Sequence, residues 1–313
     1  MTRAFTFPGQ GSQAVGMGKE LADAFPAAKA VFDEVNDALS QDLMALMWGG
    51  PEDELTLTEN AQPALMAVSV AVMRTLESEG GWSLADKASF VAGHSLGEYS
   101  ALAAAGTFTL ADTARLLKTR GKAMQAAVPV GEGAMAAMLG LSFEDAQAVA
   151  AEAAGDEVCS AANDNADGQV VISGSKAAVE RAAVLAKEKG AKRAMLLPVS
   201  APFHCALMQP AADAMAEALA SVDMKAPSVP VVANVTASAV SDPDQIRKLL
   251  VEQVTGMVRW RESVKYLAAQ GVTELVETGA GKVLTGLTRR IDKSVGGAAI
   301  GTPADITSFL ETL

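Results

Sequence analysis

The sequence predicts an α/β fold in which a parallel sheet, covered by helices on both faces, is interrupted by a smaller inserted unit. In the outer parts of the chain, short apolar segments alternate with helical patterns. The middle part instead places two helical patterns among four short strand patterns. The length of 313 residues also exceeds what one compact core usually holds. Alternating strands and helices favour a parallel sheet, because each connection must cross the sheet.

The elements expected in the outer segments are apolar stretches bounded by Gly, Pro or polar residues. They are strands at 4–7, 88–92, 229–233 and 273–276, and helices at 60–79, 96–105, 110–127, 210–220, 243–254 and 260–270. Pro63 is expected in the first turn of its helix, where a missing N–H breaks no hydrogen bond. Together, 1–127 and 199–313 are predicted to form one large, discontinuous catalytic domain.

The middle segment has a different order of elements. Strands are expected at 134–139, 158–162, 170–173 and 194–199, with helices from 142 and at 175–189. This β-α-β-β-α-β order is that of a ferredoxin-like unit. A small ferredoxin-like domain is therefore predicted at 128–198.

Composition narrows the class of protein. The chain has 25 Lys and Arg against 37 Asp and Glu, a net charge of −12, which argues against a nucleic-acid partner. No apolar stretch approaches the roughly 20 residues of a membrane helix, and the first residues lack the pattern of a signal peptide. Two cysteines provide neither a disulfide framework nor a metal cluster. We therefore expect a cytoplasmic enzyme without a metal and without a membrane partner.

Gly93-His94-Ser95-Leu96-Gly97 matches the G-x-S-x-G pattern of a nucleophilic serine. An apolar strand precedes it and a helix follows, so the sharp turn would raise the Ser95 hydroxyl above the sheet. The first amides of that helix, notably that of Leu96, would face a developing oxyanion. The alternative is a strand-to-helix turn without chemistry. The context favours a nucleophile and an α/β-hydrolase-like core.

A serine needs a base within hydrogen-bond reach, and the chain contains only two histidines. His94 adjoins Ser95, so its side chain should leave the turn in another direction. By elimination, His204 is the candidate base, in a loop stiffened by Pro198 and Pro202. The alternative is a buried structural histidine. The group that would orient His204 is left open: a carboxylate, an amide or a backbone carbonyl would each serve.

Two glycine-rich segments raise the question of a nucleotide. The turn Gly9-Gln10-Gly11 follows the first strand, so its amides could complete an oxyanion hole at the edge that carries Ser95, or it could be an ordinary turn. It is not a dinucleotide fingerprint, because position 14 is Ala. The segment at 279–283 lacks both the first glycine and the Ser or Thr of a phosphate loop. No nucleotide cofactor is expected.

Several basic residues lie close together in the sequence although the chain as a whole is acidic. Nothing local distinguishes Arg120 from Arg115 or Lys118. The largest cluster consists of Lys187, Lys189, Lys192 and Arg193, and a second group contains Lys282, Arg289 and Arg290. Such clusters are usually solvated helix ends. They would also suit docking of an acidic partner, since complementary charge speeds encounter.

Four separated motifs resemble one family. They are Phe7-Pro8-Gly9-Gln10-Gly11-Ser12-Gln13, Gly93-His94-Ser95-Leu96-Gly97-Glu98-Tyr99, Arg120, and Phe203-His204. In this order they closely resemble the malonyl-CoA:acyl-carrier-protein transacylases of bacterial fatty acid synthesis. The resemblance runs from the first strand to the C-terminal region and includes the inserted ferredoxin-like unit.

The resemblance implies a ping-pong acyl transfer without a cofactor, with a CoA thioester as substrate. The implied roles are nucleophile for Ser95, general base and acid for His204, oxyanion-hole amides for Gln10 and Leu96, carboxylate partner for Arg120, and histidine-orienting carbonyl for Gln253. Asn163 and Asn165 fall in a loop that resembles one beside the family's active site, and their role is left open.

The implied partners are malonyl-CoA and an acyl carrier protein. The cluster from Lys187 to Arg193 would dock the carrier protein. A monomer is expected. Three rival interpretations remain. A serine hydrolase or thioesterase would release free malonate, a related transferase would serve a polyketide carrier, and an inactive relative would only bind the carrier. Arg120 and the missing acidic partner of His204 argue against the hydrolase.

Overall fold

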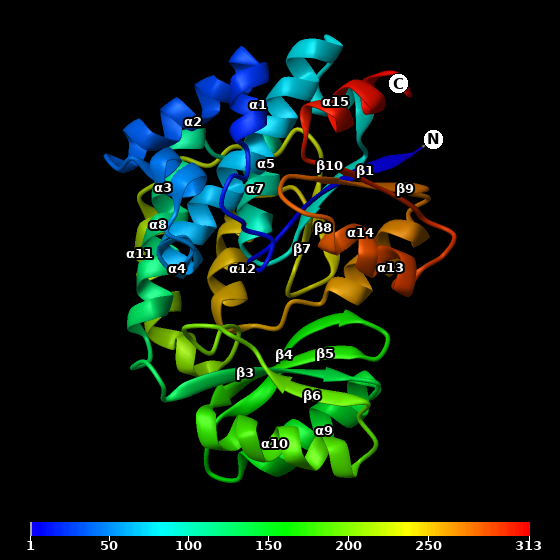
Figure 1. Cartoon of the computed structure of the whole chain (residues 1–313). Coiled ribbons are helices and arrows are strands. Elements are labelled where there is room, and N and C mark those ends of the chain that lie inside the picture. Colours follow the sequence, from blue (N-terminus) through cyan, green and yellow to red (C-terminus); the bar gives the residue numbers. More distant parts are fainter. Residues whose placement is uncertain (1) are drawn as a thin grey trace.

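The computed structural model describes residues 2–313 and contains two β-sheets (Figure 1). The larger has six strands in the order β10-β9-β1-β2-β7-β8. Their bounds are β1 (Arg3–Phe7), β2 (Phe90–Gly93), β7 (Val231–Ala233), β8 (Ser238–Val240), β9 (Glu274–Thr278) and β10 (Gly296–Ile300). The first five strands in this spatial order pair in parallel, which confirms the expected parallel sheet. β8 and β10 were not predicted. β8 pairs antiparallel with β7, as a short hairpin connection requires.

Helices cover both faces of this sheet. Alternate strand residues point to opposite sides: Phe5 and Val91 join the largest apolar core, whereas Ala4 and Ala92 join another. Helices α5 (Thr58–Gly80), α7 (Leu96–Ala104) and α8 (Leu110–Ala126) pack on the first side. Helices α13 (Trp260–Ala269) and α14 (Val283–Ile291) pack on the second (Figure 1).

The remaining elements of the large unit are shorter or lie at its rim. They are α1 (Lys19–Ala24), α2 (Pro26–Leu39), α3 (Leu43–Gly49), α4 (Glu52–Thr56), α6 (Leu84–Lys87), the 3-10 helix η1 (Ala206–Met208), α11 (Gln209–Ala220), α12 (Pro243–Thr255) and α15 (Pro303–Leu310). The position predicted for Pro63 is wrong: α5 begins at Thr58, so the proline lies inside the helix, past its first turn. The carbonyl of Glu59 therefore loses the N–H that a residue four positions later would supply.

The smaller sheet has four strands in the order β4-β5-β3-β6, all antiparallel. Its elements are β3 (Gly133–Leu139), α9 (Phe143–Ala154), β4 (Cys159–Ala166), β5 (Gln169–Ser175), α10 (Lys176–Glu188) and β6 (Arg193–Leu196). The predicted β-α-β-β-α-β order is confirmed. Both helices pack on one face, and the other faces the large unit (Figure 1). The domain bounds given above stay a prediction.

One strand of the small sheet is bonded to the large unit. The N–H of Asp164 in β4 donates to the carbonyl of Val258, whose own N–H donates to Ala162, both at 2.9 Å. The Arg261 guanidinium contacts both carboxylate oxygens of Asp164, at 3.0 and 2.9 Å. These bonds fix the small sheet against the large one. No helix among residues 2–313 is long and apolar enough to cross a bilayer.

Candidate active site

The sequence around Ser95 forms a sharp turn between β2 and α7. Ser95 has φ 54° and ψ −111°, a backbone conformation that residues other than glycine rarely adopt. Two glycines make the turn possible. A Cβ on Gly93 would lie 1.9 Å from the backbone of Gly97, and a Cβ on Gly97 would lie 2.2 Å from the carbonyl oxygen of Phe7. The G-x-S-x-G segment therefore has the predicted strand-turn-helix context.

Ser95 and His204 are brought together although 109 residues separate them. Ser95 Oγ lies 2.7 Å from His204 Nε2. The other ring nitrogen, Nδ1, lies 2.9 Å from the carbonyl of Gln253 and 3.1 Å from that of Gly256. Because carbonyls only accept, Nδ1 must carry the proton, so Nε2 is free to accept the serine proton. The orienting groups are backbone carbonyls, one of the three possibilities left open above.

Burial sets the charge of His204. Its side chain is buried, and this desolvation, helped by the positive charge of Arg120, lowers the pKa of His204 to about 3. The imidazole is therefore neutral near pH 7, as a general base must be. His94 takes no part in this pair: its Nε2 lies 2.8 Å from Asn165 Oδ1, and its ring contacts Trp260. Elimination between the two histidines thus agrees with the geometry.

Arg120 on α8 is buried and lies in the same site. Its Nη2 donates to Ser95 Oγ at 3.2 Å and to Gln253 Oε1 at 2.7 Å. Nη1 donates to Gln62 Oε1 at 2.8 Å, and the guanidinium lies over the ring of Tyr99. Two neutral amides therefore hold the cation beside the serine, with no carboxylate in direct contact.

The structure separates Arg120 from its neighbours on α8, which the sequence could not. Arg115 is exposed and pairs with Asp112 across one helical turn. Lys118 is paired with Glu59 at the start of α5. Arg120 alone of these three faces the Ser95 site, because α8 presents that side of its surface to α5 and α7.

Gln253 on α12 forms hydrogen bonds with four other residues of the site. Its backbone carbonyl accepts from His204, and its side-chain oxygen accepts from Arg120. Its amide Nε2 donates to the carbonyl of Ser95 and to Glu98 Oε2, both at 2.9 Å. Only the backbone contact was expected. The side chain was missed because nothing in the local pattern of α12 marks it.

Gln10 and Leu96 border the same space as Ser95. The turn at 9–11 packs against the serine turn, since a Cβ on Gly9 would lie 2.8 Å from the carbonyl oxygen of His94. The Gln10 side chain accepts from Thr58 Oγ1 at 2.9 Å. Leu96 is the first residue of α7, so its N–H has no partner within the helix. The role of both amides in an oxyanion hole stays a prediction.

A cavity of about 570 Å³ opens above Ser95, between the two sheets. The large unit contributes Ser95, Arg120 and His204, among others, and the small sheet contributes Met135 and Val171. Asn163 and Asn165 also line it, but both lie in β4 rather than in the expected loop. Their strand continues past 162 because register shifts accommodate the extra residues and because Val258 pairs with its outer side.

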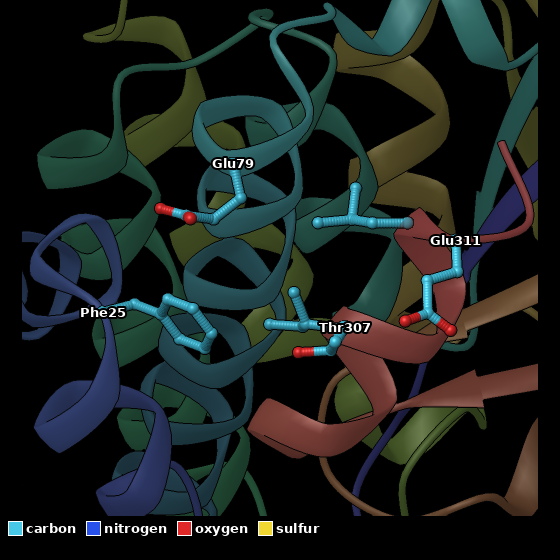
Figure 2. A pocket seen from close by; sticks show the side chains of 6 residues that line it. Phe25, Glu79, Thr307 and Glu311 are labelled. Carbon is cyan, nitrogen blue, oxygen red and sulfur yellow. The ribbon is translucent and has the colours of Figure 1, made fainter.

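A second groove carries no comparable chemistry. The groove in Figure 2, between α5 and α15, is lined by Phe25, Glu79, Thr307 and Glu311, with Ile306 and Leu310, and holds neither histidine nor cysteine. No group of three or more His, Cys, Asp or Glu in the described part of the chain could hold a metal ion.

The basic cluster from 187 to 193 lies at the end of β6 that is farther from the cavity. Arg193 begins β6, whereas residues 197–199, beyond its other end, line the cavity. Lys189 is paired with Glu152 at 2.5 Å, and Arg193 is exposed. In the second basic group, Arg290 donates to Gln169 Oε1 on the small sheet.

Three buried polar residues near Ser95 were missed. Gln62 interrupts the apolar run of α5, and Glu98 is the one charged residue of α7; both patterns were visible in the sequence. Asn234 follows β7 and had no such signal. Burial raises the pKa of Glu98 to about 7, against the opposing effects of Gln253, Asn234 and Arg120.

Comparison with known proteins places this arrangement among acyl transferases. A family model described as an acyl transferase domain matches residues 4–299. The malonyl CoA-acyl carrier protein transacylase of Escherichia coli (strain K12) is 50% identical over 308 residues, covering 98% of each chain. That of Bacillus subtilis (strain 168) is 46% identical, covering 99% of this chain and 96% of the relative.

Solved structures agree with these relatives. The acyl-carrier-protein-S-malonyltransferase from Bartonella henselae has a TM-score of 0.97 and 58% identity, covering 100% of this chain and 99% of the other. A malonyl-transacylase solved in complex with its type II PKS acyl-carrier protein has a TM-score of 0.96 and 46% identity, covering 100% of both chains.

Proposed function

This chain belongs to the acyl transferase domain family, among its malonyl CoA-acyl carrier protein transacylases, and on this premise we propose that it transfers malonyl from malonyl-CoA to the phosphopantetheine thiol of an acyl carrier protein. The transfer supplies extender units for fatty acid synthesis. One observation carries the proposal: the base His204 and the buried Arg120 both lie within hydrogen-bond distance of Ser95 Oγ.

In the first half-reaction, Ser95 is acylated. His204 Nε2 takes the hydroxyl proton as Oγ attacks the thioester carbon, and the amides of Gln10 and Leu96 stabilise the oxyanion. The tetrahedral intermediate then collapses, the C–S bond breaks, and His204 returns the proton to the CoA sulfur. The products are malonyl-Ser95 and free CoA.

The second half-reaction reverses these steps with a different thiol. The carrier's pantetheine thiol gives its proton to His204 and attacks the Ser95 ester. The C–O bond breaks, and Oγ recovers the proton. The carbonyl of Gln253 keeps the His204 ring in the tautomer that both steps need.

Arg120 selects the acyl group. Its guanidinium can pair bidentately with the free carboxylate of malonyl, held in place by Gln62 and Gln253. An acetyl group would leave this buried cation without an anion, at a cost of about 3–5 kcal/mol. The site therefore favours acyl groups that carry a second carboxylate.

The basic cluster of Lys187, Lys189, Lys192 and Arg193 is proposed to dock the acidic carrier. Reversing the charges of Lys187, Lys192 and Arg193 to Glu should raise the KM for carrier by about 3- to 10-fold, through lost steering and orientation. The rate of acylation by malonyl-CoA should not change. Lys29→Glu on α2 serves as a control, and equal effects on both half-reactions would contradict docking here.

The proposal also includes a cytoplasmic location, catalysis without a cofactor, and a monomer. The location is supported by Cys159 and Cys205, which are both free and buried. The mechanism above uses only side chains, backbone groups and the two thioesters.

The experiment that tests the proposal is brief incubation of the intact protein with malonyl-CoA or with acetyl-CoA, followed by mass measurement and peptide mapping. The expected result is a malonyl adduct on Ser95, little acetyl adduct, no adduct in Ser95→Ala, and discharge on adding holo acyl carrier protein. Release of free malonate without carrier would instead indicate a hydrolase. No adduct and no turnover would contradict the proposal.

A further inference from the structure

Asn234 bridges the turn that carries Ser95. It directly follows β7, the strand beside β2, so it emerges at the same edge of the sheet as Ser95. Its side chain is buried, Oδ1 accepts from the Ser95 N–H at 2.7 Å, and Nδ2 donates to the carbonyl of Gly93 at 2.6 Å. One carboxamide therefore holds the backbone before and at the serine.

The chemistry of the two partners fixes the orientation of this side chain. The Ser95 N–H can only donate and the Gly93 carbonyl can only accept, so the amide cannot be turned over without losing both bonds. The serine that it holds has a positive φ, which is unfavourable for a residue with a Cβ. Such a conformation persists only where its surroundings enforce it.

Asn234 is itself held on two sides. Its N–H donates to Glu98 Oε2 at 3.2 Å, the oxygen that also accepts from Gln253. Its carbonyl accepts from the N–H of Arg259 at 3.0 Å, next to Val258, which pairs with β4. The residue thus links the serine turn to the network around His204 and to the small sheet.

We propose that Asn234 is a positioning residue for the acyl transfer, because it holds the peptide units around Ser95 so that Oγ points at His204 and the Leu96 amide faces the cavity. This inference rests on the proposed function. Asn234 does not itself line the cavity, and its side chain bonds to the Ser95 turn rather than to His204. Its effect on rate therefore comes through the geometry of Ser95.

The first test is the rate constant of Ser95 acylation in Asn234→Ala at saturating malonyl-CoA. Misplacing a reacting group by about 1 Å can cost about 100-fold, so we expect a fall of that order with KM changed less than about threefold. Asn36→Ala is the matched control, because Asn36 also bridges a loop, accepting from Met44 N–H and donating to Asp42, both at 3.1 Å. It should keep the wild-type rate.

A second variant protects the test against loss of folding. Asn234→Asp keeps the shape and the acceptor for Ser95, but its ionised form has no donor for Gly93. Protonation restores a donor, so the acylation rate should recover as pH falls. The ionisable groups around the new carboxyl are Glu98 and Arg259, together with Arg120, His204 and His94 at the Ser95 turn. Glu98 should raise the pH at which recovery occurs, and the Arg120 cation should lower it. Arg259 is paired with Glu262, and the two histidines are buried, which favours their neutral forms.

The outcomes separate a positioning role from a merely structural one. Rates that fall only in proportion to the folded fraction, measured by near-ultraviolet circular dichroism, would overturn the proposal, as would a wild-type rate in Asn234→Ala. Labelling of Ser95 by a fluorophosphonate, which needs no malonyl group, should slow to a similar degree. If the wild-type protein is labelled fast but transfers no malonyl, the proposed function fails. The positioning role is then decided by whether Asn234→Ala is labelled more slowly than wild type.

Discussion

Burial decides what the ionisable side chains beside Ser95 can do. His204 is kept neutral by desolvation, Glu98 is pushed toward its protonated form for the same reason, and Arg120 stays close to both without touching either. Gln253 lies between the cation and Glu98 and bonds to each. Neutral amides therefore carry the contacts that a salt bridge would otherwise make, and the guanidinium remains available to an incoming carboxylate.

The first prediction at this scale concerns pH. Because the pKa of His204 is lowered to about 3 from 6.5, the base stays unprotonated as pH falls from 8 to about 5.5. Single-turnover acylation should therefore show no loss with a midpoint near 6.5. Glu98→Gln removes the carboxyl whose pKa is raised to about 7 and which would itself titrate in this range. A fall in the acylation rate with a midpoint near pH 6.5 in both wild type and Glu98→Gln would show that His204 has an ordinary pKa.

The second prediction concerns selection of the acyl group. Arg120→Ala should lower the rate of Ser95 malonylation by about 100- to 1,000-fold, the equivalent of roughly 3–4 kcal/mol of lost ion pairing. Acetyl loading should rise relative to malonyl loading. Competition between the two CoA esters, followed by mass spectrometry, measures the ratio. Arg115→Ala, on the exposed side of the same helix, should leave the ratio unchanged, and an unchanged ratio in Arg120→Ala would refute the role in carboxylate binding.

At the scale of the element, the second glycine of the serine turn is required by a contact with another strand. Gly97 lies in α7 against the backbone of β1, which is itself fixed between β2 and β9. Neither side can move away from an added methyl group. The close packing of helix on strand is what places the first amides of α7 under the cavity.

This packing predicts opposite effects for two helical glycines. Gly97→Ala should lower the free energy of unfolding by about 2–3 kcal/mol or more, because its Cβ would meet the Phe7 carbonyl at 2.2 Å. Gly286→Ala in α14 meets nothing within 4 Å and should stabilise the protein by up to about 1 kcal/mol. Urea unfolding measures both. Equal stability of the two variants would show that the serine turn tolerates a side chain.

Sequence could predict elements that carry a motif or extend a regular order of strands and helices, but it missed α2 and β10 as well as shorter elements. The strand-turn-helix around Ser95 and the β-α-β-β-α-β order of the small unit follow from local patterns. α4, with five residues, and β8, with three, are too short for periodicity to appear. The polar segment 163–165 was expected to be a loop. Sequence could not show that it extends a strand, because its pairing depends on Val258 from a distant part of the chain.

At the scale of the whole molecule, the site exists only where the two units meet. Sequence could name Ser95 and His204 as a pair, since only two histidines compete. It could not choose Arg120 from residues alone, because burial follows from how α8 packs. Asn234 and the Gln253 side chain depend on contacts more than 130 residues apart in sequence. Such positions become visible only once the sheet order is known.

The joint between the units gives the last prediction. Asp164 is fully buried and its carboxylate relies on Arg261, although burial still raises the pKa of Asp164. Arg261→Ala should lower the free energy of unfolding by about 3–5 kcal/mol, because it leaves a buried charge unpaired. Arg259→Ala breaks a partly exposed pair with Glu262 and should cost no more than about 1 kcal/mol. Similar losses in both would show that Asp164 does not depend on Arg261.

The order of strands in the large sheet also bears on how the protein is made. Among the strands of this sheet β1 is translated first, yet one of its two neighbours, β9, is translated after β2, β7 and β8. The carbonyl that orients His204 likewise belongs to residue 253. A nascent chain that has not reached this point has the serine without its oriented base. We therefore expect Ser95 to gain its oriented base only after about four fifths of the chain has been translated.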